Sequence, residues 1–181
     1  MTPKDILKNY HYEKLSSKHD LSNFTCGVDD LDEFLKCDAL DQQNQNLNVT
    51  YLAVHKNEIL GYVSISADKI ECKKINKKIE VKYPFYPSVK ICRLAVNQKY
   101  KGIGLGNEIL ASICGLIKNL SKELGVKFIT VDAYLNAYEF YKKNSFTPKR
   151  IHNIKKLERK AKRNETTSIF MYKSIKKIKI S

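Results

Sequence analysis

RLAVNQKYKGIGLGN, residues 93–107, is the stretch of sequence that decides the fold. Its first part closes an apolar, β-rich run that predicts a strand over Val89 to Val96. Its last part has glycine at every second position. A helical pattern of apolar residues then runs from Asn107 to Leu124 and ends at Gly125. We therefore predict a strand, a glycine-rich turn and a helix over residues 90–120.

The glycine-rich turn has the chemistry of an anion site. Gly102, Gly104 and Gly106 leave the backbone free to adopt positive φ and to approach a ligand closely. The unpaired N–H groups of the first helical turn point outward, and the positive end of the helix dipole adds to them. Lys101 places a cation at the edge of the turn. A pyrophosphate is the predicted ligand, and a plain glycine-rich connection is the alternative.

Two better-known phosphate loops do not fit this turn. The dinucleotide fingerprint G-x-G-x-x-G needs its third glycine one place after Gly106, where the sequence has Asn107. A Walker A loop needs Lys-Ser or Lys-Thr after its last glycine, and the turn has neither. Dinucleotide binding and nucleoside triphosphate hydrolysis are therefore disfavoured.

The remaining pattern predicts an α/β (α+β) protein with a mixed central sheet of six to seven strands flanked by helices. A helix after the fourth strand makes a right-handed crossover to the fifth, so the centre of the sheet should be parallel. Residues 69–90 are rich in lysine and contain two prolines, which favours a long excursion from the sheet. Strands are predicted at 12–16, 49–54, 59–66, 89–96, 126–131, 146–151 and 166–172, and helices from residue 29, over 107–124 and over 137–143.

Length and composition are those of one ordinary domain. The 181 residues, 43% hydrophobic, can close one core, and we expect a single domain over 1–181 with its core at about 10–173 and a basic tail at 174–181. No apolar run is long enough to cross a membrane, and the first residues lack the apolar centre of a signal peptide. A cytoplasmic protein without membrane contact is the expectation.

Cysteine and histidine spacing favours neither disulfides nor a metal. The five cysteines are odd in number and have no short C-x-x-C spacing. The four histidines are scattered and pair with no cysteine at metal-ligand spacing. No metal cofactor is predicted.

The net charge of +14 is concentrated near the C-terminus. Residues 1–68 carry −5, whereas the last 40 residues carry 14 Lys+Arg against 2 acidic residues. A field of this kind attracts an anionic partner such as nucleic acid. Uniform use of lysine on solvated surfaces is the alternative, although it fits the acidic first segment poorly.

Residues 93–97, followed by KGIGLG at 101–106, resemble the acetyl-CoA motif Q/R-x-x-G-x-G/A of the GNAT family of N-acetyltransferases. Lysine stands at the first motif position, which keeps the charge and loses a planar two-point contact. A second block, NAYEFYKKNSF at 136–146, is similar to the family's helix-then-strand block, with Ser145 in place of its usual glycine. The resemblance implies acetyl-CoA as co-substrate, held by Leu94, Ala95, Val96, Lys101, Gly102, Ile103, Gly104, Leu105, Gly106, Asn107 and Asn136.

The resemblance also implies the chemistry: an amine attacks the acetyl thioester directly. Tyr141 would protonate the departing CoA thiolate, and a backbone amide of Leu94–Val96 would stabilise the oxyanion. A core aromatic is the alternative for Tyr141. No base is convincing, because the fourth strand offers Cys92 and Arg93, and Asp132 is the nearest carboxylate. A cysteine acyl-enzyme at Cys92 stays as a further alternative.

The N-terminal half is similar to the branch of the family that contains toxins acetylating the amino group of aminoacyl-tRNA. The resemblance rests on FTCG at 24–27, LDEFL at 31–35, Ala39-Leu40, Thr50-Tyr51 and Gly61-Tyr62. It implies an aminoacyl-tRNA acceptor bound through the basic C-terminal region and, by analogy, a homodimer and a small antitoxin-like partner. An acetyltransferase of small amines or of protein amines is the competing interpretation. A third is an inactive domain that binds CoA or RNA as a regulator.

Overall fold

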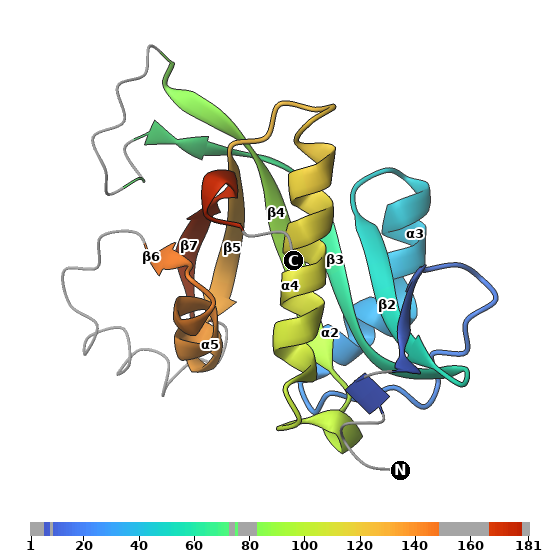
Figure 1. Ribbon diagram of the computed structural model, residues 1–181. Helices are drawn as coiled ribbons and strands as arrows, with labels where there is room; N and C mark the ends of the chain where they lie inside the picture. Colours follow the sequence, from blue (N-terminus) through green and yellow to red (C-terminus); the bar gives the residue numbers. More distant parts are fainter. Residues whose placement is uncertain (1–5, 8, 73–74, 76–82, 149–166, 179–181) are drawn as a thin grey trace. The chain divides into compact units, whose positions relative to one another are not determined.

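The computed structural model describes residues 6–7, 9–72, 75, 83–148 and 167–178 (Figure 1). The described strands form a seven-stranded sheet in the order β1-β2-β3-β4-β5-β7-β6. Strands β1 to β3 pair antiparallel, as do β5, β7 and β6. Helix α4 joins the neighbours β4 and β5, which is the crossover that parallel strands require. The sheet is mixed and the fold is α+β, which confirms the prediction.

The strands are β1 (His11–Lys14), β2 (Val49–His55), β3 (Glu58–Glu71), β4 (Phe85–Val96), β5 (Phe128–Tyr134), β6 (Thr147–Pro148) and β7 (Ser168–Ser174). The α-helices are α2 (Asp29–Glu33), α3 (Ala39–Asn44), α4 (Leu105–Leu120) and α5 (Tyr138–Lys143). A π-helical turn η1 (Phe34–Asp38) joins α2 to α3, and short 3₁₀ turns form η3 (Gln98–Tyr100), η4 (Leu135–Ala137) and η5 (Ile175–Lys177).

The chain divides into two compact units. The first unit contains residues 1–66 and 91–113, and the second contains residues 67–90 and 114–181. Strands β3 and β4 and helix α4 each run from one unit into the other. The single domain predicted over residues 1–181 stays a prediction.

The first unit is built on the β2–β3 hairpin. Lys56 and Asn57 form its two-residue turn, and both have positive φ, 48° and 64°. Such a turn matches the right-handed twist of the paired strands. Tyr62 of β3 is fully buried, and its hydroxyl donates to the carbonyl oxygen of Leu31 at 2.8 Å. This bond ties α2 to the sheet, so the hairpin predicted from the sequence also positions the first helix.

Gly61 marks a close approach of three elements in the first unit. A Cβ at this position would lie 2.7 Å from Cδ1 of Ile109 and 2.8 Å from the carbonyl oxygen of Ala95. Ile109 belongs to α4 and Ala95 to β4. Only glycine therefore lets β3 approach the backbone of β4 and the first half of α4 this closely.

The second unit has its own small core, made by Ile70, Tyr86, Phe128 and Tyr172. The ring of Phe128 packs edge-on against Tyr86 and Tyr172, with centroids 5.7 Å from each. Strand β7 pairs with β5 along its whole length, from Phe128 opposite Ser174 to Tyr134 opposite Ser168. Ile129 and Met171 on the same strands are fully buried as well, so both faces of β5 and β7 are covered.

The predicted element pattern differs from the structure in several places. Strand β3 continues to Glu71 and β4 begins at Phe85, so the predicted excursion over 69–90 is partly sheet. The Cys72 amide donates to the Pro84 carbonyl oxygen at 2.9 Å, so backbone pairing continues beyond the predicted end of the strand. The helix predicted from residue 29 is broken into α2, η1 and α3, because η1 adopts the wider π-helical bonding.

Buried residues also occur after the predicted core. The core limits of about 10–173 stay a prediction, and Ile175 and Ile178 beyond them are buried. The Ile175 amide donates to the Lys127 carbonyl oxygen at 3.1 Å, and the Lys118 ammonium group donates to the Ile178 carbonyl oxygen. Packing in the second unit therefore continues at least to residue 178.

Several predicted features lie outside the described residues. Only Thr147 and Pro148 of the strand predicted over 146–151 form a described strand. The basic residues between 149 and 163 are not described, nor is the end of the tail after residue 178. Among the helices that are described, none is both long enough and apolar enough to cross a membrane.

Replacing Gly61 with alanine should destabilise the protein. The new Cβ must displace Ile109 or the Ala95 carbonyl group, so we expect the free energy of unfolding to fall by roughly 1–3 kcal/mol. Gly115→Ala within α4 is the matched control. Its Cβ meets nothing within 4 Å, and alanine is the better helix former, so stability should hold or rise by about 1 kcal/mol. Urea denaturation of both variants gives the comparison, and equal stabilities would contradict the close approach.

Candidate functional site

Asn97 fixes the point at which β4 ends. It is 2% exposed, and its backbone amide donates to the Leu60 carbonyl oxygen at 2.8 Å. Its side-chain amide nitrogen donates to the Ile59 carbonyl oxygen at 3.3 Å, and its side-chain oxygen accepts from the Lys99 amide at 3.1 Å. The last bond caps η3. The chain therefore leaves the sheet at a fixed place before it enters the glycine-rich turn.

The glycine-rich turn presents a run of free backbone donors. Gly102 and Gly104 have φ of 80° and 93°, a region that other residues rarely adopt. Within the described part of the chain, no amide of residues 102–106 donates a backbone hydrogen bond. A Cβ at Gly102 or Gly104 would meet nothing within 4 Å, so the space around the turn is open. The geometry is that of a cradle for an anion at the start of a long helix.

The free donors end one residue earlier than expected. Helix α4 begins at Leu105 rather than at Asn107, and the Asn107 amide donates to the Gly104 carbonyl oxygen at 2.9 Å. Leu105 and Gly106 are thus the first two helical residues, whose amides have no partner inside a helix. Lys101 is exposed beside them. The predicted anion site is narrowed to residues 101–106, and the backbone amide of Asn107 lies outside it.

The loop over residues 24–28 is tied to the same turn. The Gln98 amide donates to the Thr25 carbonyl oxygen at 2.8 Å, and Gly27, with φ of 75°, lies so close that a Cβ would be 2.1 Å from Nε2 of Gln98. The Asp32 carboxylate accepts from the Cys26 amide at 2.7 Å and from the Thr25 hydroxyl at 2.8 Å. Sequence reasoning missed this role of Asp32, because the residue looks like an ordinary acidic residue of a first helical turn.

Cys26 in this loop is a packing residue. Its side chain is buried, and this burial, together with the nearby Asp32 carboxylate, raises the pKa of the thiol to about 11. The thiol therefore stays protonated at neutral pH and is a poor nucleophile.

The strand before the turn carries the other predicted cofactor contacts of the first unit. Ala95 is buried, whereas Leu94 and Val96 are half-buried. Two residues upstream of Leu94, the thiol of Cys92 lies 3.2 Å from the Ser66 hydroxyl, within hydrogen-bond reach. The strand segment and the glycine-rich turn thus belong to the same compact unit.

Tyr141 and Asn136 belong to the second unit. Tyr141 on α5 is 6% exposed and packs edge-on against Phe140 and Phe146, with ring centroids at 5.1 Å and 5.3 Å. Burial, and to a lesser extent the Cys114 thiol, raises the pKa of Tyr141 well above its usual range. Its hydroxyl has no hydrogen-bond partner among the described residues. Asn136 lies exposed on η4.

Ser145 ends α5 in the left-handed conformation that the family's glycine would adopt. Its φ is 66°, and its amide donates to the Lys142 carbonyl oxygen at 3.0 Å. The next amide, of Phe146, donates to the Tyr141 carbonyl oxygen at 3.0 Å. These bonds hold the residues around Tyr141 despite the substitution.

The carboxylate considered as a base is already paired. In the second unit, Asp132 of β5 forms an ion pair with Lys90 of β4 at 2.6 Å. The Asp132 carboxylate is therefore already engaged by a cation in the structure. In the parts of the chain that are described, no group of histidine, cysteine or acidic side chains could hold a metal ion.

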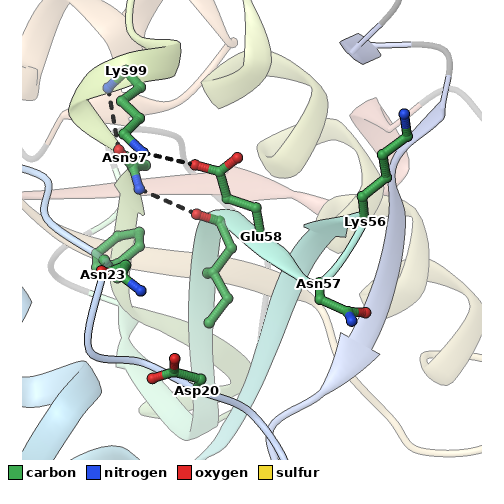
Figure 2. A pocket seen from close by; sticks show the side chains of 9 residues that line it. Asp20, Asn23, Lys56, Asn57, Glu58, Asn97 and Lys99 are labelled. Atoms are coloured by element: carbon green, nitrogen blue, oxygen red, sulfur yellow. Dashed lines mark hydrogen bonds and ion pairs between the residues drawn. The ribbon is translucent and has the colours of Figure 1, made fainter.

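A cavity of about 340 Å³ in the first unit was not anticipated from the sequence. Figure 2 shows Asn97, Lys99 and Glu58 at one end of this cavity and Asp20 at the other. The Glu58 carboxylate accepts from the Tyr100 hydroxyl at 2.6 Å and from the Lys99 ammonium group at 3.1 Å. The hydrogen bond from Tyr100, and to a lesser extent the one from Lys99, lowers the pKa of Glu58. Burial, together with the bond to Glu58, raises the pKa of Tyr100 to about 12. The cavity wall therefore ties the β2–β3 turn to η3.

The family follows from comparison with known sequences. The sequence model described as "Acetyltransferase (GNAT) domain" matches residues 7–156. This chain therefore belongs to the GNAT acetyltransferase family and is an acyltransferase by family. It is 23% identical over 121 residues to a tRNA-acetylating toxin of Mycobacterium tuberculosis, covering 66% of this chain and 73% of that protein. It is 22% identical to a probable toxin TacT of Sinorhizobium fredii, covering 64% and 67%.

Solved structures share the fold. A tyrosine-to-phenylalanine mutant of KacT matches with a TM-score of 0.81 and 22% identity, covering 94% of this chain and 97% of that one. AtaT complexed with acetyl-methionyl-tRNAfMet matches with a TM-score of 0.76 and 23% identity, covering 90% and 94%. AtaTR bound with AcCoA matches with a TM-score of 0.76 and 23% identity, covering 94% and 96%. At these identities the likeness defines the fold.

Replacing Asn97 with alanine should loosen the origin of the turn. The substitution leaves the Ile59 carbonyl group and the Lys99 amide without their partner, so we expect a loss of about 2 kcal/mol in the free energy of unfolding. Asn23→Ala is the control, because Asn23 is exposed on the rim of the same cavity and makes no side-chain hydrogen bond with a described residue. Chemical denaturation measures both variants. A loss no larger than that of the control would contradict the anchoring role.

Proposed function

We propose that this protein transfers the acetyl group of acetyl-CoA to a primary amine by direct attack. The observation that carries the proposal is the run of free amides over residues 102–106 at the start of α4, in a chain of the GNAT family. Five donors in one turn and the positive end of a sixteen-residue helix suit a pyrophosphate. Acetyl-CoA carries such a group.

The proposal gives each predicted residue a role. The amides of Gly102–Gly106 take the pyrophosphate, with Lys101 as an added cation. Leu94–Val96 pair with the pantetheine arm as a further strand would, and one of their amides stabilises the oxyanion. The hydroxyl of Tyr141 gives its proton to the departing thiolate. With its pKa raised by burial, the hydroxyl is protonated at working pH, as a proton donor must be. Asn136 and Asn107 are assigned to the rim of the cofactor.

We propose the α-amino group of aminoacyl-tRNA as the acceptor. The M. tuberculosis relative is a tRNA-acetylating toxin, and the AtaT neighbour is complexed with acetyl-methionyl-tRNAfMet. An aminoacyl ester's amine is less basic than that of lysine, so it needs little help from a base. That fits a chain in which Asp132 is paired with Lys90 and Cys92 lies against Ser66. The basic sequence over 149–163 would add attraction for RNA.

Partners and setting follow from the same acceptor. Another AtaT structure is described as bound to the C-terminus of the antitoxin AtaR, which supports a small antitoxin-like partner for this chain. Aminoacyl-tRNA is a cytoplasmic substrate, so we place the protein in the cytoplasm. A homodimer stays a proposal by family analogy.

The test is release of free thiol from acetyl-CoA by the purified protein. Bulk aminoacyl-tRNA should support release, whereas deacylated tRNA should not. Release with polyamines or peptides alone would replace the tRNA acceptor by small or protein amines. No release with any amine, together with retained acetyl-CoA binding, would favour the inactive regulator.

Tyr141→Phe should separate catalysis from binding. We expect kcat to fall by roughly 100-fold, since a general acid contributes about that much, with the affinity for acetyl-CoA within about twofold. In the wild type, the raised pKa of Tyr141 means that activity should show no alkaline descending limb up to about pH 10. Tyr138→Phe on the same helix is the control, because Tyr138 is also buried and should leave kcat unchanged. Equal effects of the two variants would remove Tyr141 from its role.

Gly104→Ala should weaken acetyl-CoA binding without crowding the site. The new Cβ meets open space, but φ of 93° is strained for alanine, so the turn must distort and its amides diverge. We expect the Kd for acetyl-CoA to rise at least about tenfold, which corresponds to 1.4 kcal/mol. Gly125→Ala, another loop glycine in open space and without positive φ, should leave the Kd unchanged. Calorimetric titration measures the Kd of both variants. An unchanged Kd for Gly104→Ala would mean that the turn only connects β4 to α4 and does not bind acetyl-CoA.

A further inference from the structure

The guanidinium group of Arg93 is held in one orientation beside the proposed acetyl site. In the first unit its guanidinium group lies over the ring of Phe34, 5.2 Å from the centroid. Its Nη1 donates to the Cys92 carbonyl oxygen at 3.0 Å, and its Nε lies 3.6 Å from the Asp30 carboxylate. Stacking and a backbone bond thus fix the plane of the group on the side of α2 and η1.

The guanidinium group of Arg93 has N–H donors that are not used in hydrogen bonds. Its Nε is buried and has no hydrogen-bond partner, because Asp30 stands beyond hydrogen-bond distance. The side chain as a whole is 36% exposed, so part of it is open to solvent although Nε is buried. An ion pair this long and this exposed is weak, and an incoming anion can compete with Asp30.

A second observation is that residue 93 is an arginine and not a lysine. Of the 33 cationic residues, 29 are lysines and four are arginines, and Arg93 is the one arginine among the described residues. A composition that favours lysine on solvated surfaces does not account for an arginine stacked on a buried phenylalanine. Arginine differs from lysine in its planar fork, which matches two oxygens of a phosphate or carboxylate group.

We propose that Arg93 binds a backbone phosphate of the acceptor RNA near its aminoacylated 3′ end. This inference rests on the proposed function. Arg93 immediately precedes Leu94, the first residue of the strand segment assigned to the pantetheine arm and the oxyanion. An amine that attacks there brings the 3′-terminal nucleotide of its carrier with it. The fork of Arg93 is the nearest fixed cation on the same strand, so a phosphate of that nucleotide is its ligand.

The experiment compares two acceptors that differ in phosphate. One is aminoacyl-tRNA, and the other is a phosphate-free 3′-aminoacylamido adenosine with the same amino group. For aminoacyl-tRNA, Arg93→Gln should raise KM roughly tenfold with kcat within about twofold, since one charge-assisted contact is lost. The slope of log kcat/KM against log salt should become shallower by about 0.7, the value for one phosphate on a single strand. For the adenosine compound KM should not change.

Two further variants guard against a purely structural effect. Arg93→Lys keeps the charge without the fork and should lie between the wild type and Arg93→Gln. Lys36→Gln, which removes an exposed charge from η1, should behave as the wild type on both acceptors. Acetyl-CoA affinity and thermal unfolding of Arg93→Gln should match the wild type within the scatter of the controls.

The outcomes are distinguishable. An equal loss on both acceptors, or no loss on either, overturns phosphate binding by Arg93 while the proposed acetyl transfer stands. A wild-type enzyme that acetylates the adenosine compound as efficiently as tRNA also overturns it. A wild-type protein that acetylates neither acceptor overturns the proposed acceptor, and the role of Arg93 with it.

Discussion

The buried side chain of Asn97 is the fixed point on which the site depends. It bonds to the backbone of β3 on one side and caps η3 on the other, so the end of β4 and the beginning of the turn are set together. Gly61 makes this arrangement sterically possible, because a residue without a Cβ lets β3 lie against the Ala95 carbonyl group. Gly102, five positions after Asn97, is the first residue of the turn with a free amide. The positive-φ glycines can then present their donors outward, because the chain on both sides of them is held.

Some elements of the fold were predictable from the sequence, and others were not. The β2–β3 hairpin, the glycine-rich turn and α4 were predictable, because alternation, glycine spacing and helical periodicity are local signals. The start of α4 was placed two residues late, since Gly106 looks like part of a turn although it occupies a helical position. The extensions of β3 and β4 were missed because residues 67–71 and 85–88 show no clear alternation of apolar and polar residues. Only backbone pairing between distant residues, such as Cys72 with Pro84, defines them.

The roles of Asp32, Tyr62 and Arg93 were beyond the sequence for the same reason. Each acts through a partner that is remote along the chain or set by a loop: Asp32 on the Cys26 amide, Tyr62 on the Leu31 carbonyl group, and Arg93 on the Phe34 ring. Helical and strand periodicity describe which face a residue occupies. They do not describe which backbone group comes within hydrogen-bond distance of it.

Two departures from the family pattern illustrate where geometry is needed and where charge suffices. Ser145 replaces a glycine but still adopts φ of 66°, at a strain of about 1 kcal/mol that the two backbone bonds around it offset. Lys101 replaces a planar donor, and it stands exposed next to the five amides that we propose as donors to the pyrophosphate. A point charge is enough at such a place. Beside Leu94 the proposed phosphate would be oriented by a side chain, and Arg93 alone among the described cations has a planar fork to do it.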